Sequence, residues 1–273
     1  MKTGFKELDN KIKLNNGELI IIAATACMGK TTFVSNIMDN VAIKQNKGVL
    51  FFSLETSKES LWVKSISNNA TIENSKVDLF AAHQLDNSLD ISKLTEEDID
   101  RITYGKELLK NAPIYIEDKV PYTIEDIRKK SREMKLNKDI DLIIIDYVQL
   151  VLGDNEELSR AEEIEDILMK LKILAKELNV PIIVTSYLSA KIERRENKRP
   201  FMSDFSNVGF LTYSDIVLFI YREPYDNKNR SNVAEIIIAK NRDGGTGIVK
   251  LAWIPEYRKF GNAIFMEDKN EDK

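Results

Sequence analysis

One stretch near the amino terminus limits the possible folds of this chain more than any other. It reads LIIIAATACMGKTT from Leu19 to Thr32. The apolar run at its start is too short to span a membrane. After the glycine, Phe33, Ile37 and Val41 recur at helical spacing on one face. The stretch therefore predicts a buried strand, a tight loop and a helix, in that order.

The loop has the residue pattern of a phosphate-binding loop. Backbone N–H groups of such a loop and of the following helix point into one concavity, where they hold the phosphates of a nucleotide. In this pattern Lys30 reaches the β- and γ-phosphates, and the Thr31 hydroxyl ligates Mg²⁺. The usual first glycine is Ala24 here, which costs only the freedom to adopt positive φ. Considered without the preceding strand, Gly-Lys-Thr could also be the start of an ordinary helix that binds no phosphate. The residues expected to bind ATP are Ala24, Thr25, Ala26, Cys27, Met28, Gly29, Lys30, Thr31 and Thr32.

Composition restricts the class of protein. A hydrophobic content of 43% and a charged content of 31% in 273 residues describe an ordinary globular chain. The net charge of −4 excludes a globally basic nucleic-acid coat, so any nucleic-acid contact must be a local patch. With one cysteine and one histidine, the sequence predicts neither a disulfide nor a zinc site. We expect a cytoplasmic protein with no membrane partner, one domain over residues 1–266, and a disordered charged tail over 267–273.

Two further apolar runs end in acidic residues. Val49–Leu54 is followed by Glu55, and Leu142–Ile145 is followed by Asp146. Parallel strands joined by helices place their carboxyl ends at one edge of the sheet, beside the phosphate loop. We therefore expect Glu55 near the γ-phosphate and Asp146 facing Mg²⁺. The alternative for Asp146 is a turn or capping residue.

The remaining pattern predicts an α/β fold. Its sheet is mostly parallel and twisted, with helices on both faces and antiparallel strands at the carboxyl-terminal end. Residues 68–92 give no clear assignment. The other predicted helices are 57–67, 95–110, 123–135 and 159–177, and the other predicted strands are 114–116, 181–186, 215–221, 234–240, 247–253 and 262–266.

Together these motifs resemble the motor domain of DnaB-type replicative helicases, within the RecA-like P-loop ATPases. The resemblance spans nearly the whole chain. Its residues are Thr3-Gly4-Phe5, Ala24 to Thr31, Phe52 to Glu55, Ile145 to Leu150, Arg199-Pro200, Ser203-Asp204 and Ile238 to Arg242.

The resemblance implies roles for individual residues. Glu55 would orient the attacking water, and Asp146 would hold Mg²⁺. Lys240 and Arg242 would reach the γ-phosphate of a neighbouring subunit, which implies a homohexamer and a possible helicase loader as partner. A surface pair at the end of a hairpin is the alternative for Lys240 and Arg242. The amino-terminal domain with which such helicases bind primase is expected to be absent.

The sequence departs from the family where DNA is bound. Tyr187 replaces the glutamine that senses the γ-phosphate, Thr212 and Tyr213 replace an acidic residue and a glutamine, and an Arg-Glu-Ser-Gly stretch reads Ser-Asn-Val-Gly from Ser206. The net-basic segment Lys191–Arg199 is either a DNA-contacting patch or a solvated face. The candidate DNA-binding residues are Arg194, Arg195, Lys198, Arg199, Ser206, Asn207 and Gly209.

Three functions fit these observations. The first is an ATP-dependent DNA helicase motor that hydrolyses ATP with Mg²⁺ and moves on single-stranded DNA in replication. The second is a RecA-like or clock-like ATPase that does not unwind DNA. The third is a paralogue deficient in DNA coupling that joins or blocks a helicase ring.

Overall fold

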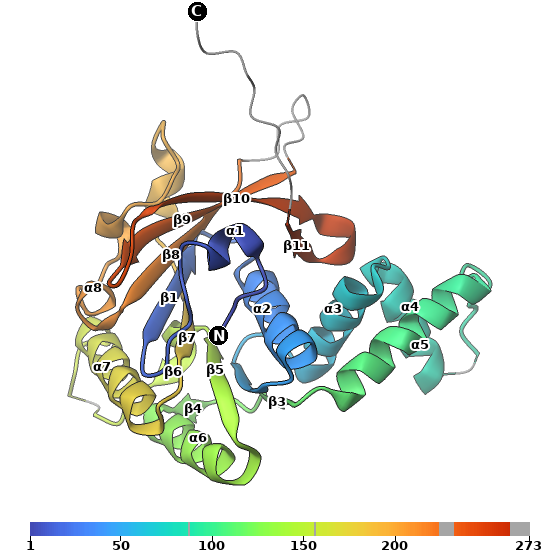
Figure 1. The fold of residues 1–273 in the computed structure, drawn as a ribbon, viewed down its shortest axis with the longest axis horizontal. Coiled ribbons are helices and arrows are strands. Elements are labelled where there is room, and N and C mark those ends of the chain that lie inside the picture. The colour runs from blue at the N-terminus through green and yellow to red at the C-terminus, as the bar shows by residue number, and fades with distance from the viewer. Residues whose placement is uncertain (87, 156, 224–231, 263–273) are drawn as a thin grey trace, which may run out of the picture.

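The computed structural model describes residues 1–86, 88–155, 157–223 and 232–262. Within these segments the main sheet has nine strands in the order β11-β10-β9-β8-β1-β7-β5-β2-β3 (Figure 1). The strands are β1 (Leu19–Ala24), β2 (Gly48–Ser53), β3 (Ile114–Glu117), β5 (Ile140–Asp146), β7 (Ile182–Tyr187), β8 (Ile216–Tyr221), β9 (Val233–Asn241), β10 (Gly247–Ile254) and β11 (Lys259–Gly261).

The sheet is parallel from β3 to β8 and antiparallel beyond β8. Ile20 of β1 lies opposite Ile183 of β7 and Ile216 of β8, so these three central strands run in register. The predicted mixed sheet is confirmed. β11 pairs with β10 and ends before Asn262. Of the predicted strand 262–266, residues 263–266 lie outside the described residues, as does the expected tail, 267–273.

Helices cover both faces of the sheet. α2 (Lys30–Gln45) and α3 (Lys58–Ala70) lie on one face, and α6 (Ile124–Lys138) and α7 (Arg160–Leu178) lie on the other (Figure 1). Alternate β1 side chains enter the two apolar clusters, Ile20 on the α2 face and Ile21 on the α7 face. This two-sided burial explains why the strand is continuously aliphatic rather than alternating.

Side-chain caps set where several helices begin. The side chains of Thr95, Thr123 and Ser159 each accept a hydrogen bond from the backbone N–H of the residue three positions later. The carboxylate of that later residue in turn accepts a hydrogen bond from the backbone N–H of the capping residue. These capping boxes satisfy N–H groups that the helix itself leaves free. The box predicted at Ser159 is confirmed. A short α1 (Lys6–Asp9), a short α8 (Gly209–Tyr213) and a small parallel pair, β4 (Tyr122–Thr123) with β6 (Val151–Leu152), complete the fold.

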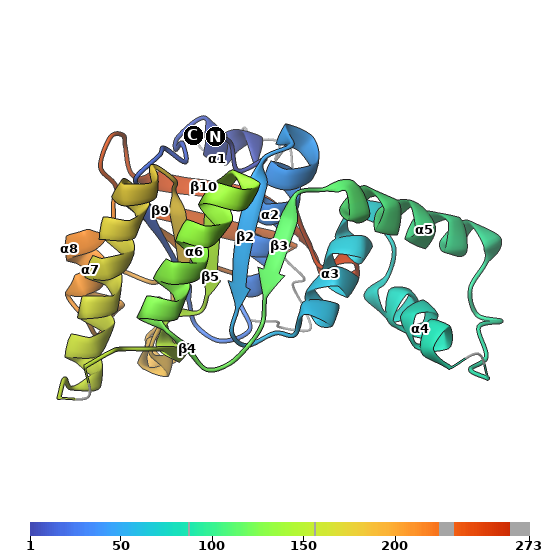
Figure 2. The same cartoon turned by 90° about the horizontal axis from the view of Figure 1, so that it is seen from below.

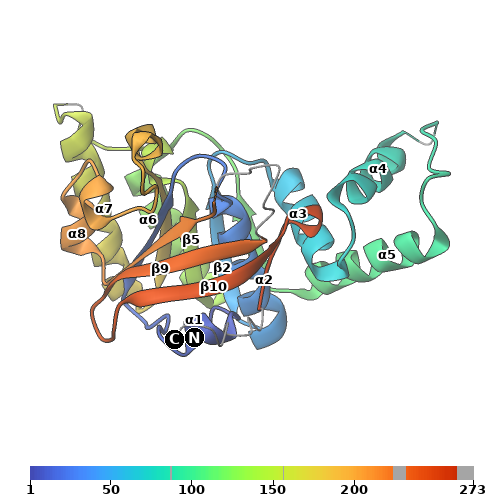
Figure 3. The same cartoon turned by 90° about the horizontal axis from the view of Figure 1, so that it is seen from above.

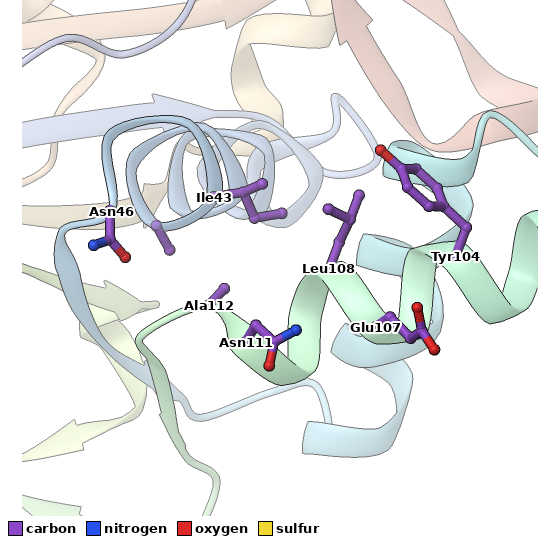
Figure 4. Close-up of a pocket in the computed structure, with 8 residues that line it drawn as sticks. Ile43, Asn46, Tyr104, Glu107, Leu108, Asn111 and Ala112 are labelled. Carbon is purple, nitrogen blue, oxygen red and sulfur yellow. The ribbon is translucent and has the colours of Figure 1, made fainter.

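A helical arm projects from the β3 edge of the sheet (Figure 2). It consists of α4 (Asn74–Leu85), in the stretch that the sequence left unassigned, and α5 (Glu96–Asn111). A small cluster that includes Val77 and Ile102 joins them. A cavity of about 290 Å³ separates α5 from the carboxyl end of α2; Figure 4 shows its lining. It lies at the end of α2 away from the phosphate loop.

None of the helices within the described segments combines the length and apolar character needed to cross a membrane.

Candidate nucleotide-binding site

The loop after β1 is shaped to present backbone N–H groups. Gly29 precedes α2 with φ of 93°, and Cys27 also has positive φ, 60°. A Cβ at Gly29 would lie 3.1 Å from a ring carbon of Phe260, so the position favours glycine for space as well as for φ. Ala24 is still part of β1 and extended. The first position of the motif therefore needs no glycine here.

Arg222, which was not predicted from the sequence, donates hydrogen bonds to backbone carbonyls of this loop. It follows β8, its Nε donates to the Met28 carbonyl at 3.2 Å, and its guanidinium lies 4.4 Å from the centroid of the Trp253 ring. Burial lowers its pKa. The Arg222 hydrogen bond fixes the carbonyl of the residue that precedes Gly29. The available sequence signal was its place after a strand whose carboxyl end lies beside the loop.

Lys30 is a buried cation inside the concavity. Its Nζ donates to the carbonyls of Ala24 and Thr25, each at 3.3 Å. Burial lowers its pKa to about 8, opposed by the charges of Asp146 and Glu55. The ammonium is therefore largely protonated at pH 7. A buried cation among N–H donors suits a polyphosphate.

Thr31 and Asp146 meet on the same edge. The Thr31 hydroxyl donates to Asp146 Oδ2 at 2.7 Å, and the Thr185 hydroxyl donates to Oδ1. The Asp146 carboxyl is buried, and this burial raises its pKa, opposed by the two hydrogen bonds. Mg²⁺ in nucleotide sites takes one or two protein oxygens together with phosphates and water. The hydroxyl and carboxylate fit that donor set, and among the described residues no larger His, Cys, Asp and Glu cluster offers another.

Glu55 lies exposed after β2, within reach of Tyr187. The Tyr187 hydroxyl donates to the two Glu55 carboxylate oxygens at 3.4 and 3.3 Å, and the Tyr187 ring centroid lies 3.4 Å from Lys30 Nζ. The structure thus brings together Lys30, Thr31, Glu55 and Asp146, as the sequence predicted, and adds Tyr187.

One further cation, Lys64, lies near Asp146 and Glu55. Burial and the charge of Arg258 lower the Lys64 pKa, whereas Asp146 and Glu55 raise it. Lys64 belongs to α3, the helix after Glu55, and Arg258 lies in the turn before β11. Sequence reasoning missed both. The only sequence signal for Lys64 was its position in the helix that follows Glu55. No local sequence pattern indicated Arg258.

Lys240 and Arg242 lie near the amino ends of the parallel strands, away from the phosphate loop. They belong to the long β9–β10 hairpin that Figure 3 shows. Lys240 pairs with Val217 near the start of β8, and its Nζ donates to the carbonyls of Leu211 and Ser214. Arg242 Nη1 lies 3.3 Å from Asp215 Oδ1, and the arginine side chain is 68% exposed. The Asp215 N–H donates to the carbonyl of Leu19, the first residue of β1. Leu19 lies five residues before the carboxyl end of β1, a distance of about 17 Å along the strand. Neither side chain reaches the phosphate loop of its own chain.

The candidate DNA-binding residues divide into two groups. Arg195 pairs with Asp204, and Arg199 pairs with Glu235, each through two short hydrogen bonds. Asn207 and Gly209 are buried; the Asn207 amide donates to the Ala161 carbonyl and accepts from the Gly209 N–H. These four residues therefore make hydrogen bonds within the chain. Arg194 and Ser206 are exposed and Lys198 is half-buried.

Cys27 gives a direct test of the loop. Its thiol is exposed between Ala26 and Met28, so alkylation is expected to fill the phosphate position and block nucleotide binding. Mg²⁺ with ATP should slow the modification, which mass spectrometry can follow. Cys27→Ser should bind nucleotide normally and resist the reagent. Modification that leaves nucleotide binding untouched would place Cys27 outside the site.

Comparison with known proteins agrees with this geometry. The DnaB-like helicase C terminal domain family matches residues 1–262. Replicative DNA helicase DnaB of Geobacillus stearothermophilus is 41% identical over 265 residues, and replicative DNA helicase DnaC of Bacillus subtilis is 39% identical over 265. Each alignment covers 95% of this chain and 56% of the relative, so the chain spans about half the length of these curated relatives.

Solved structures give the same answer. One of them, described as an ATPase domain, superposes with a TM-score of 0.86 at 34% identity, covering 96% of this chain and 91% of that one. A second structure, a DnaB-like replicative helicase described with its interactions with primase, superposes with a TM-score of 0.88 at 32% identity. The match covers 96% of this chain and 62% of that one. The chain belongs to the DnaB-like helicase C-terminal domain family.

Proposed function

We propose that this chain is the ATP-hydrolysing motor of a replicative DNA helicase, which moves on single-stranded DNA. The observation that supports this most directly is the convergence of Lys30, Thr31, Asp146 and Glu55 at one sheet edge, joined by hydrogen bonds and by the mutual effects of their charges. Its family membership supplies the link to DNA replication.

Each residue has a distinct task in this proposal. Lys30 binds the β- and γ-phosphates, and the loop N–H groups orient them. Thr31 and Asp146 would hold Mg²⁺, which when bound neutralises charge on the phosphates. Glu55 orients the attacking water and accepts its proton. Lys64, whose pKa the charges of Asp146 and Glu55 raise, adds positive potential on the same side.

The proposal includes assembly into a homohexameric ring. Because Lys240 and Arg242 lie far from their own phosphate loop, they would act at the site of a neighbouring subunit. Single-stranded DNA would contact the exposed Arg194 and Ser206 together with backbone N–H groups. A helicase loader is a further possible partner, and the cytoplasm is the proposed location.

One pair of measurements tests the proposal. ATP hydrolysis is measured with and without single-stranded DNA, and light scattering with a nonhydrolysable nucleotide follows assembly. Stimulated hydrolysis with ring assembly supports the motor. Unstimulated hydrolysis supports an ATPase that does not unwind, and no hydrolysis supports an accessory paralogue.

We expect weak stimulation of hydrolysis by DNA. Ser206 stands where the resemblance places an arginine, and Asn207 and Gly209 are buried. Ser206→Arg is expected to strengthen binding and to steepen its salt dependence by about 0.7 in the slope of log K against log salt, the value for one phosphate contact to a single strand. Fluorescence anisotropy over a salt series measures both.

Ser75→Arg on α4 is the matched control, since it adds the same charge at an exposed serine remote from the site. An equal gain from Ser75→Arg would indicate a general charge effect. Tight, strongly stimulating binding by the unmodified chain would contradict the expectation.

A further inference from the structure

Tyr187 links the two groups that must act on a terminal phosphate. Its ring centroid is 3.4 Å from Lys30 Nζ, and its hydroxyl is 3.3 and 3.4 Å from the two Glu55 carboxylate oxygens. The distances place the phenol side chain against the ammonium at one end and against the carboxylate at the other. The position between phosphate ligand and base is therefore filled by protein.

Several contacts fix Tyr187 in this position. The Gln149 side chain accepts from the Tyr187 N–H and donates to its carbonyl, both at 3.3 Å, and also donates to the Ser186 hydroxyl at 2.8 Å. The Tyr147 ring meets the Tyr187 ring edge to face, with centroids 4.6 Å apart. Burial and the Glu55 charge raise the pKa of Tyr187 to about 12, so the hydroxyl keeps its proton as a donor. The placement is built by β5, β7 and the turn between Asp146 and Leu150.

We propose that Tyr187 is a specificity-determining residue that disfavours ATP relative to ADP by occupying the place of the terminal phosphate. The inference rests on the proposed ATPase function. Lys30 and the loop N–H groups hold the β-phosphate of ADP and of ATP alike, and only ATP also places a phosphate between Lys30 and Glu55. The γ-phosphate must approach Lys30 on the side of Glu55, so ATP has to move the phenol and break its contacts with both side chains. Tyr187 therefore lowers the affinity for the triphosphate more than the affinity for the diphosphate.

Equilibrium titration of the full chain with fluorescent ADP and with a fluorescent nonhydrolysable ATP analogue, both with Mg²⁺, tests this. Tyr187→Leu removes the ring and the hydroxyl. It is expected to tighten the ATP analogue by roughly 2- to 30-fold, the range of one cation–π contact, and to tighten ADP less, because ADP does not enter the space between Lys30 and Glu55. Tyr187→Phe keeps the ring over Lys30 and should change the ratio of the two affinities less.

Tyr104→Leu on the exposed face of α5 is the matched control and should change neither affinity. If Tyr187→Leu does not fold by circular dichroism, Tyr187→Met, which also lacks the ring, serves in its place. An unchanged ratio, or weaker binding of the analogue, would overturn the inference, because Tyr187 would then not compete with the phosphate. Absence of binding of either nucleotide to the unmodified chain would instead overturn the proposed function.

Discussion

Lys30→Ala is expected to weaken nucleotide binding by roughly 10- to 150-fold, the equivalent of about 1.5–3 kcal/mol for a hydrogen bond to a charged group. Glu55→Gln is expected to bind ATP as the unmodified chain does and to hydrolyse it roughly 10²- to 10⁴-fold more slowly, because it loses only the group that accepts the proton. The difference follows from the structure: Lys30 is buried within the loop, whereas Glu55 lies exposed beside it. Fluorescent-nucleotide titration and steady-state hydrolysis measure the two quantities.

Two neighbouring substitutions are matched controls. Lys58→Ala and Glu59→Gln change the same residue types at exposed positions in the first turn of α3. Both should leave binding and hydrolysis nearly unchanged. Equal loss of binding in Lys30→Ala and Glu55→Gln would contradict the separate roles of the two residues.

The clustering of the candidate nucleotide-binding residues was predictable because its signals are local in sequence. Lys30 and Thr31 follow a strand directly, and Asp146 ends an aliphatic run. The rule that parallel strands share a carboxyl edge was then enough to bring these residues together. The hydrogen bond between Thr31 and Asp146, 115 residues apart, confirms that placement.

Contacts set by tertiary structure were not predictable in this way. Segment 68–92 contains α4, of which only Val77 is buried and whose start has no side-chain cap, so neither periodicity nor capping marked it. No sequence pattern indicated that Arg199 of the basic segment 191–199 pairs with Glu235 on β9, 36 residues away. Likewise, the contact of Tyr187 with Glu55 joins residues 132 apart. Sequence spacing carries no signal for such pairs.

Arg242→Ala is expected to lower hydrolysis by roughly 10³- to 10⁵-fold if Arg242 stabilises the transferring phosphoryl group in a neighbouring subunit. The substitution also removes a contact with Asp215, but Lys172 still pairs with that carboxylate, so the fold should persist. Thermal unfolding by circular dichroism checks this point. Arg242→Lys, which keeps the charge beside Asp215, separates loss of the ion pair from loss of the guanidinium.

Mixing two inactive variants shows whether Arg242 acts between subunits. Lys30→Ala destroys its own site but still donates an arginine, whereas Arg242→Ala keeps a whole site. Random exchange in a head-to-tail ring makes about one quarter of the interfaces complete, so up to about that fraction of the original hydrolysis should return. The comparison is the mixture against the sum of the separate variants at equal total protein. If mixed rings form and no activity returns, Arg242 acts within its own subunit or only holds Asp215, and the proposed ring motor loses its main support.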